Sequence, residues 1–166
     1  KLQQLIASTN MLTCGEDLGM LNESVSRCMT NLNILSLELQ IMPKEYGVDL
    51  GNPAGYPYLS VCTTSTHDCE TLRMWLGQRN GTSDATPQEC LKVLEKNLAS
   101  PSMLAIFPLQ DWLSIDGTLR NPDAASERIN IPAVPDHYWK YRMHLTIEDL
   151  LAAEDLNKTI KELSSR

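Results

Sequence analysis

Residues 59–75 read LSVCTTSTHDCETLRMW, and this stretch decides the fold that we expect. Its first five residues, Leu59–Thr63, are mostly apolar or β-branched, which is typical of a buried strand. From Leu72 onward the apolar residues recur at the spacing of one helix face, and Gly77 is placed to end that helix. The stretch therefore predicts a buried strand, a polar loop and a helix in succession.

The polar loop carries His67 and Asp68 just past the carboxyl end of the predicted strand. In parallel α/β sheets and barrels, ligands and catalytic groups gather at this edge. An alternative is that Asp68 only caps the helix that follows. A second acidic stretch in the equivalent place, CGEDLG at Cys14–Gly19, favours the functional interpretation.

Three other short apolar runs have the character of strands. They are Met11–Cys14, Ile34–Leu39 and Met103–Phe107. Strands that alternate with helical segments indicate a parallel sheet with right-handed crossovers, so the predicted fold class is α/β. Four parallel strands with their helices would make one half of an eight-stranded TIM (β/α)8 barrel.

Local signals mark where three helices begin. Asn22 can cap a helix with an apolar face, and Thr86–Glu89 forms a capping box with Pro at its first helical position. Thr146 is placed to cap a last helix near the end of the chain. Between the predicted strands, Gln40–Pro57 is a long loop rich in Pro and Gly, and loops of that length are often functional.

The composition limits the classes of partner. The 166 residues suit one domain, and a net charge of -7 argues against nucleic acid or an anionic membrane. No apolar run approaches the ~20 residues of a membrane helix. We interpret the aromatic and basic stretch His137–His144 as domain-edge packing or sugar stacking. The chain begins KLQQLIASTN, with no initiator Met and no cleavage-site pattern, so we expect an N-terminal part of the protein to be missing.

The five cysteines show no CxxC pair, and their number is odd. They are Cys14, Cys28, Cys62, Cys69 and Cys90. We expect small buried hydrophobes in a reducing compartment, because the spacing does not suit zinc. A catalytic thiol at Cys69, beside His67 and Asp68, is an alternative, but adjacent side chains in an extended chain point apart.

Three carboxylates follow predicted strands, namely Glu16, Asp68 and Asp111. Cleavage of a glycosidic bond needs two carboxyl groups, one to protonate the leaving oxygen and one to attack or stabilise the anomeric carbon. Carboxylates in such loops also bind metals or cap helices, so the residue pattern alone leaves these alternatives open.

Five longer segments resemble the 4-α-glucanotransferases (amylomaltase or disproportionating enzyme, glycoside hydrolase family 77). They are MLTCGEDLGML, ILSLELQIMPK, YPYLSVCTTSTHDCETLRMW, SPSMLAIFPLQDWLSID and ERINIPAVPDHYWKYRMHLTIEDL. The resemblance extends from Met11 to Lys161. It implies that residues 1–166 are a fragment of a single catalytic barrel domain, comprising its fifth to eighth strands and the terminal helix.

The resemblance also implies roles for individual residues. Glu16, in the family's EDLG motif, would be the general acid/base, and Asp68, in its His-Asp motif, would stabilise the transition state. His67 and Asn130 would bind the substrate sugar. The Arg-x-Asp-His motif that carries the family's nucleophile does not occur in this chain, so we expect the chain alone to be inactive.

The function that the resemblance implies is transfer of glucosyl or α-1,4-glucan segments between maltose and maltooligosaccharides by a retaining double displacement. The expected ligands are α-glucans, no metal or organic cofactor is needed, and the location is cytoplasmic. The fragment would pair with its missing N-terminal half or self-associate. The alternatives are an α-amylase-like hydrolase and a non-catalytic α-glucan-binding fragment.

Overall fold

The computed structural model describes residues 1–19, 21–137 and 139–165. The chain divides into two compact units, each of which is described by itself. Unit 1 comprises Lys1–Thr63 and Ala99–Ile106, and unit 2 comprises Thr64–Leu98 and Phe107–Arg166.

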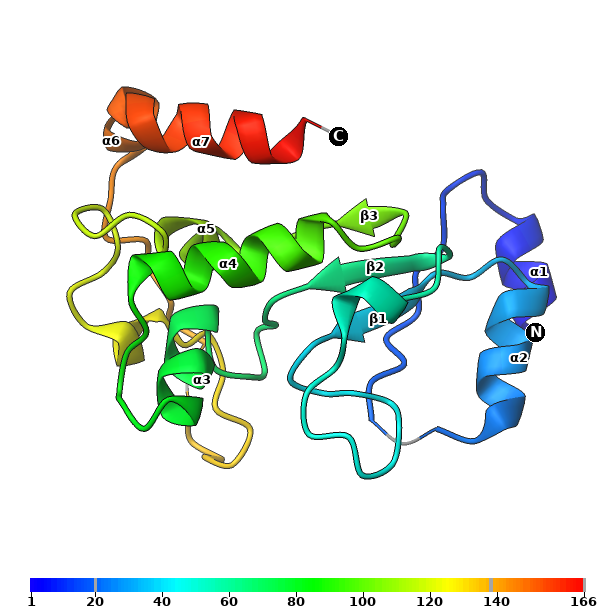
Figure 1. The fold of residues 1–166 in the computed structure, drawn as a ribbon. Helices are drawn as coiled ribbons and strands as arrows, with labels where there is room; N and C mark the ends of the chain where they lie inside the picture. The colour runs from blue at the N-terminus through cyan, green and yellow to red at the C-terminus, as the bar shows by residue number, and fades with distance from the viewer. Residues whose placement is uncertain (20, 138, 166) are drawn as a thin grey trace. The chain divides into compact units, whose positions relative to one another are not determined.

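Unit 1 is built around a parallel sheet (Figure 1). Its elements are α1 (Leu2–Ala7), α2 (Glu23–Asn31), β1 (Ser36–Leu39), the 3-10 turn η1 (Pro53–Gly55), β2 (Ser60–Thr63) and β3 (Leu104–Ala105). Strand β2 lies between β1 and β3 and pairs in parallel with both. All four residues of β2 are buried, so the strand predicted at Leu59–Thr63 is confirmed as the centre of the sheet.

The first predicted strand, Met11–Cys14, pairs with the sheet only at Cys14, which forms a parallel bridge with Leu35. Leu12 remains 59% exposed and Cys14 is exposed as well. The segment therefore does not form a strand among the described residues, and the predicted burial of Cys14 is wrong. The described residues form a three-stranded parallel sheet with one added bridge, so four strands are not confirmed.

Unit 2 is helical. Its elements are α3 (Leu72–Arg79), α4 (Pro87–Leu98), α5 (Leu109–Leu113), the 3-10 turn η2 (Ala124–Glu127), α6 (Ile147–Ala152) and α7 (Glu154–Ser164). Helix α4 packs against both α3 and α7 (Figure 1). The core of the unit consists of buried apolar side chains, among them Leu72, Trp75, Cys90, Val93, Leu94, Leu113 and Leu156. Within residues 1–19, 21–137 and 139–165, no helix combines the length and the apolar character that crossing a bilayer requires.

The predicted helix starts are confirmed by their hydrogen bonds. The side chain of Asn22 accepts a hydrogen bond from the backbone at the start of α2. The Thr86 N–H donates to Glu89 Oε2 over 2.8 Å, and the Glu89 N–H donates back to Thr86 Oγ1 over 3.3 Å. Thr146 forms a second reciprocal box, but the last helix breaks at Ala153 into α6 and α7, where one helix was predicted.

The prediction that Gly77 ends the third helix is wrong, because α3 continues through it to Arg79. A Cβ atom at Gly77 would lie 2.6 Å from the backbone nitrogen of Asp84. The Thr82 N–H also donates to the Gly77 carbonyl over 2.8 Å. Glycine is therefore required here by the close approach of another backbone segment, which is a reason that helix-ending patterns do not anticipate.

Candidate functional site

The carboxylate of Asp111, in α5, binds the loop between β2 and α3 through hydrogen bonds. Asp111 accepts hydrogen bonds from Thr64 Oγ1 at 2.6 Å, from Ser65 Oγ at 2.5 Å and from the backbone N–H of Leu72 at 2.8 Å. The residue is fully buried, and burial raises the pKa of its carboxyl group although the three hydrogen bonds oppose that shift. Asp111 therefore anchors the loop, whereas Glu16 and Asp68, the other two carboxylates that follow predicted strands, are exposed.

Asp68 does not cap α3, because Thr71 occupies the N-cap position and Asp111 binds the first backbone N–H of the helix. Its side chain is 44% exposed. Asp68 Oδ1 instead accepts a hydrogen bond of 2.6 Å from Asn130 Nδ2, and its Oδ2 lies 3.2 Å from His67 Nε2. The alternative of a simple helix cap is therefore excluded for Asp68.

Three of the four predicted site residues lie together in unit 2. The backbone N–H of Asn130 donates to the His67 carbonyl over 3.0 Å, which adds a main-chain link to the Asn130–Asp68 hydrogen bond. The ring of Trp139 lies 5.1 Å from the His67 ring, centroid to centroid, and the Trp139 side chain is 60% exposed. We call His67, Asp68, Asn130 and Trp139 the Asp68 cluster. Its carboxylate, amide and imidazole can bind sugar hydroxyls, and its indole offers an apolar face.

A buried ion-pair network fixes η2, which leads into the segment that carries Asn130. The guanidinium of Arg73 is 1% exposed and binds both carboxylate oxygens of Asp84 at 2.8 Å. It also contacts Glu127 Oε1 at 3.1 Å. Burial raises the pKa of Glu127 to about 7, although the charge of Arg73 opposes the shift. Asp84 already balances the charge of Arg73, so the protein can hold Glu127 in its neutral form.

The sequence did not predict this network, because an arginine on a helix is usually exposed and no local pattern marks Arg73 as buried. The environment of the Cys69 thiol was likewise not predictable from the sequence. Its thiol accepts a hydrogen bond from the Thr66 N–H at 3.0 Å, and burial raises its pKa. A thiol with a raised pKa stays protonated and is a weak nucleophile, which argues against the alternative of a catalytic Cys69.

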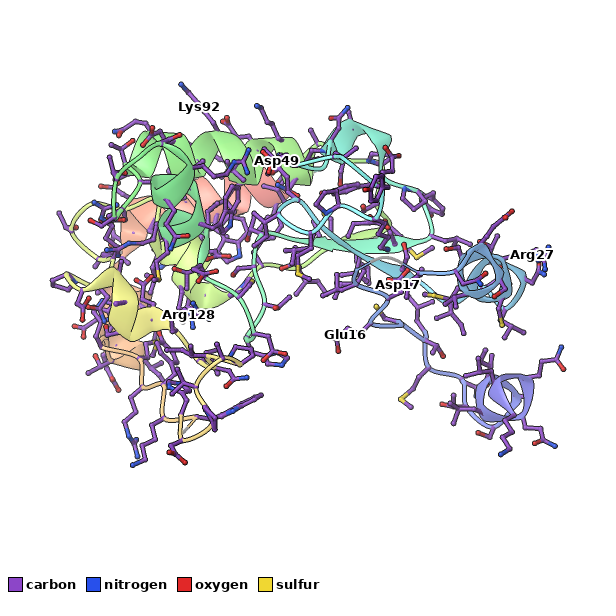
Figure 2. All side chains as sticks on the ribbon, turned by 90° about the horizontal axis from the view of Figure 1, so that it is seen from below. Glu16, Asp17, Arg27, Asp49, Lys92 and Arg128 are labelled. Carbon is purple, nitrogen blue, oxygen red and sulfur yellow. The ribbon has the colours of Figure 1, made fainter. Side chains whose placement is uncertain are left out.

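Glu16 lies in unit 1, on the loop before α2, and its side chain extends into solvent (Figure 2). The adjacent Asp17 is buried and fixes the loop to the sheet. Asp17 Oδ1 accepts a hydrogen bond of 2.7 Å from the N–H of Leu37 in β1, and its Oδ2 pairs with Lys44 Nζ at 2.8 Å. Lys44 also pairs with Glu38 at 2.8 Å. The consecutive acidic residues of the EDLG motif thus divide into an anchored Asp17 and an exposed Glu16.

Among its described residues, unit 1 contains cavities of about 440, 460 and 560 Å³, and Glu38, Lys44 and Pro57 line the first two. The first is formed mainly by the Gln40–Pro57 loop. The hydroxyl of Tyr56 is buried against this cavity without a partner among the described residues. In unit 2, the cavity that the His67 loop helps to line measures only about 20 Å³. A sugar bound at the Asp68 cluster would therefore lie on the surface of unit 2 and not inside this cavity.

Comparison with known families finds one family model that matches residues 1–146, and it describes a 4-alpha-glucanotransferase of the glycoside hydrolase 77 type. The chain is 39% identical over 178 residues to the 4-alpha-glucanotransferase DPE2 of Oryza sativa subsp. japonica. It is 28% identical over 184 residues to the 4-alpha-glucanotransferase of Chlamydia caviae. These alignments cover 98% and 99% of this chain but only 19% and 34% of the relatives, so the chain spans a fifth to a third of their length.

Solved structures show a similar fold at lower identity. The amylomaltase from Streptococcus agalactiae in complex with acarbose matches with a TM-score of 0.63 and 19% identity, over 92% of this chain and 31% of that chain. The amylomaltase from Corynebacterium glutamicum matches with a TM-score of 0.62 and 16% identity, over 92% of this chain and 28% of that chain.

Proposed function

This chain belongs to the 4-α-glucanotransferase family, glycoside hydrolase family 77, and from that membership we propose that the intact protein transfers α-1,4-glucan segments between maltooligosaccharides. The observation that carries the proposal is the family match over residues 1–146 together with the Asp68 cluster. Maltose and related α-glucans are the proposed substrates, and the cytoplasm is the proposed location.

We propose that the chain is the second half of the catalytic barrel, its fifth to eighth strands and the terminal helix. The parallel order β1-β2-β3 and the parallel bridge at Cys14 support this assignment. The fold shared with amylomaltases at TM-scores of 0.63 and 0.62 supports it as well. The nucleophile would then come from outside this chain, because no Arg-x-Asp-His motif occurs within it.

The proposed reaction is a retaining double displacement. The nucleophilic carboxylate attacks the anomeric carbon of the donor, and protonated Glu16 gives its proton to the departing glycosidic oxygen. Glu16 then removes the proton from the 4-hydroxyl of an acceptor glucan, whose oxygen displaces the enzyme carboxylate and forms the new α-1,4 bond. The exposed position of Glu16 on an anchored loop suits both proton transfers.

Asp68 would stabilise the positive charge that develops on the donor sugar and bind its hydroxyls. The contacts with Asn130 and His67 hold the carboxylate in a single orientation while leaving 44% of the side chain exposed to a ligand. We propose that His67 and Asn130 bind the same sugar with the hydrogen-bonding capacity that these contacts leave free.

Disproportionation of maltotriose by the full-length protein tests the proposal. We expect glucose together with longer maltooligosaccharides, and we expect none of these products from residues 1–166 alone. Glu16→Gln and Asp68→Asn should each lower turnover by several orders of magnitude while the melting temperature stays close to wild type. Asp136→Asn, at an exposed aspartate outside the proposed site, is the matched control.

The pattern of products separates the alternatives. Glucose and maltose without longer oligosaccharides would identify a hydrolase, because water would then replace the acceptor sugar. A full-length protein that binds maltotriose without converting it would be a non-catalytic glucan-binding protein. Near-normal turnover in Glu16→Gln or Asp68→Asn would remove that residue from its proposed role.

A further inference from the structure

The guanidinium of Arg128 joins the two segments that carry Asp68 and Asn130. Its Nη1 donates to Glu70 Oε1 over 2.6 Å, on the loop two residues after Asp68. Its Nε and Nη2 both donate to the backbone carbonyl of Asn130, over 3.2 and 3.0 Å. The Arg128 side chain is 11% exposed, whereas that of Glu70 is 35% exposed. Arg128, labelled in Figure 2, is thus a largely buried connection between the two segments.

This arrangement uses the planar fork of arginine. Two of its nitrogens bind one carbonyl while a third faces a carboxylate, so a single side chain fixes the spacing between two backbone segments. A lysine at this position could reach Glu70 or the Asn130 carbonyl but could not present a rigid set of donors to both. A glutamine would lose the charge and leave Glu70 without its cation.

Groups of the Asp68 cluster itself also link the two segments, as does the hydrogen bond of 3.2 Å from Thr71 Oγ1 to Glu127 Oε2. Asn130 bonds Asp68 through its side chain and His67 through its backbone N–H. Both Asp68 and His67 have side chains that are 44% exposed, so their orientation depends on these hydrogen bonds more than on packing. The contacts of Arg128 use no atom of the Asp68 carboxylate, the Asn130 side-chain amide or the His67 imidazole, and they leave those atoms available to a ligand.

We propose that Arg128 is a positioning residue, which holds Asn130 against Asp68 and so fixes the orientation of the Asp68 carboxylate toward the sugar. The inference rests on the proposed transferase function. Arg128 itself does not touch the sugar. A displacement of about 1 Å at a catalytic group costs on the order of 100-fold in rate. Loss of the Arg128 contacts would therefore lower turnover by displacing Asp68.

The test uses the full-length protein with three variants, Arg128→Gln, Arg128→Lys and the control Arg27→Gln. Arg27 is an exposed arginine of α2 in unit 1, so its substitution removes the same charge elsewhere (Figure 2). We expect kcat/KM for maltotriose to fall about 10- to 100-fold in Arg128→Gln and to stay at the wild-type value in the control. Arg128→Lys should also lose activity, because charge alone does not restore the fork.

Two further readouts separate positioning from a general loss of stability. Hydrogen exchange at the Asn130 amide, which donates to His67, should accelerate about tenfold or more in Arg128→Gln. In a protein that already carries Asn130→Ala, Arg128→Gln should change kcat/KM by no more than about twofold, because the contact between Asn130 and Asp68 that Arg128 positions is already lost. If Arg128→Gln does not fold, Arg128→Lys gives the same readouts.

An unchanged rate of hydrogen exchange at the Asn130 amide in Arg128→Gln would show that Arg128 does not link the two segments, whether or not the protein is active. Wild-type activity in both Arg128 variants, or losses that multiply in the double variant, would overturn its role in positioning. If the wild-type protein itself transfers no glucan, the proposed function fails instead, and the exchange experiment still decides whether Arg128 links the two segments.

Discussion

Replacing Asp111 should lower the local stability of the loop that carries His67 and Asp68. Its carboxylate is fully buried and accepts three hydrogen bonds, two from loop hydroxyls and one from the first backbone N–H of α3. In Asp111→Ala these donors lose their acceptor, at about 1–3 kcal/mol for each buried donor that stays unsatisfied. The hydroxyls of Thr64 and Ser65 can turn toward other acceptors, but the Leu72 N–H cannot. We therefore expect a net loss of about 3 kcal/mol in local stability.

Hydrogen exchange of the segment Thr64–Trp75 in the full-length protein measures this loss directly, since local opening is read without unfolding the rest of the molecule. A loss of about 3 kcal/mol corresponds to roughly 150-fold faster exchange. Asp111→Asn keeps one carbonyl oxygen for the Leu72 N–H and should lose only about 1–2 kcal/mol. Asp136→Ala, at an exposed aspartate of the same unit, controls for removing a carboxylate.

Two results would refute this reasoning. The first is an exchange rate in Asp111→Ala no faster than in the Asp136 control, which would mean that the buried carboxylate contributes nothing to the loop. The second is an Asp111→Asn protein that keeps its protection but loses transfer as completely as Asp68→Asn. That outcome would make Asp111 a chemical participant after all.

Three other substitutions test the packing. Glu127→Gln should flatten the pH dependence of stability: the raised pKa of about 7 means that the folded state favours the neutral acid, so wild-type stability falls as pH rises from about 4.5 to 7. Urea unfolding across that range should show a wild-type decline of up to about 3 kcal/mol that the variant lacks, and parallel profiles would contradict the assignment. Gly77→Ala should lower the free energy of unfolding by about 1–3 kcal/mol, because its Cβ would meet the Asp84 backbone at 2.6 Å, and an unchanged melting curve would show that the segment simply moves away. Lys44→Met should destabilise unit 1 by about 3 kcal/mol or more, because the carboxylates of Asp17 and Glu38 would then lie close together without a cation. Thermal stability equal to that of the wild type would show that solvent replaces the two ion pairs.

The predictions that succeeded depend on residues close together in the chain. The apolar run that became β2, the capping box at Thr86 and the helix cap at Thr146 involve partners within a few positions, so they can be predicted from local sequence. The prediction for Gly77 failed because a helix-ending glycine and a glycine required by close packing look alike in sequence. Met11–Cys14 has the apolar character of a strand, but a strand also needs a neighbour along its whole length.

The sequence by itself predicted the strands of the sheet and the helices that follow them in order, the parallel α/β class and the motifs that carry the family resemblance, because these depend on residue type and short spacing. Only the tertiary structure decided which carboxylates are anchors and which face solvent. Asp111 meets Thr64 across 47 residues of chain and Asp68 meets Asn130 across 62, so no local pattern could reveal either contact. A carboxylate is left exposed or buried by what folds against it, and that is settled by distant segments in three dimensions.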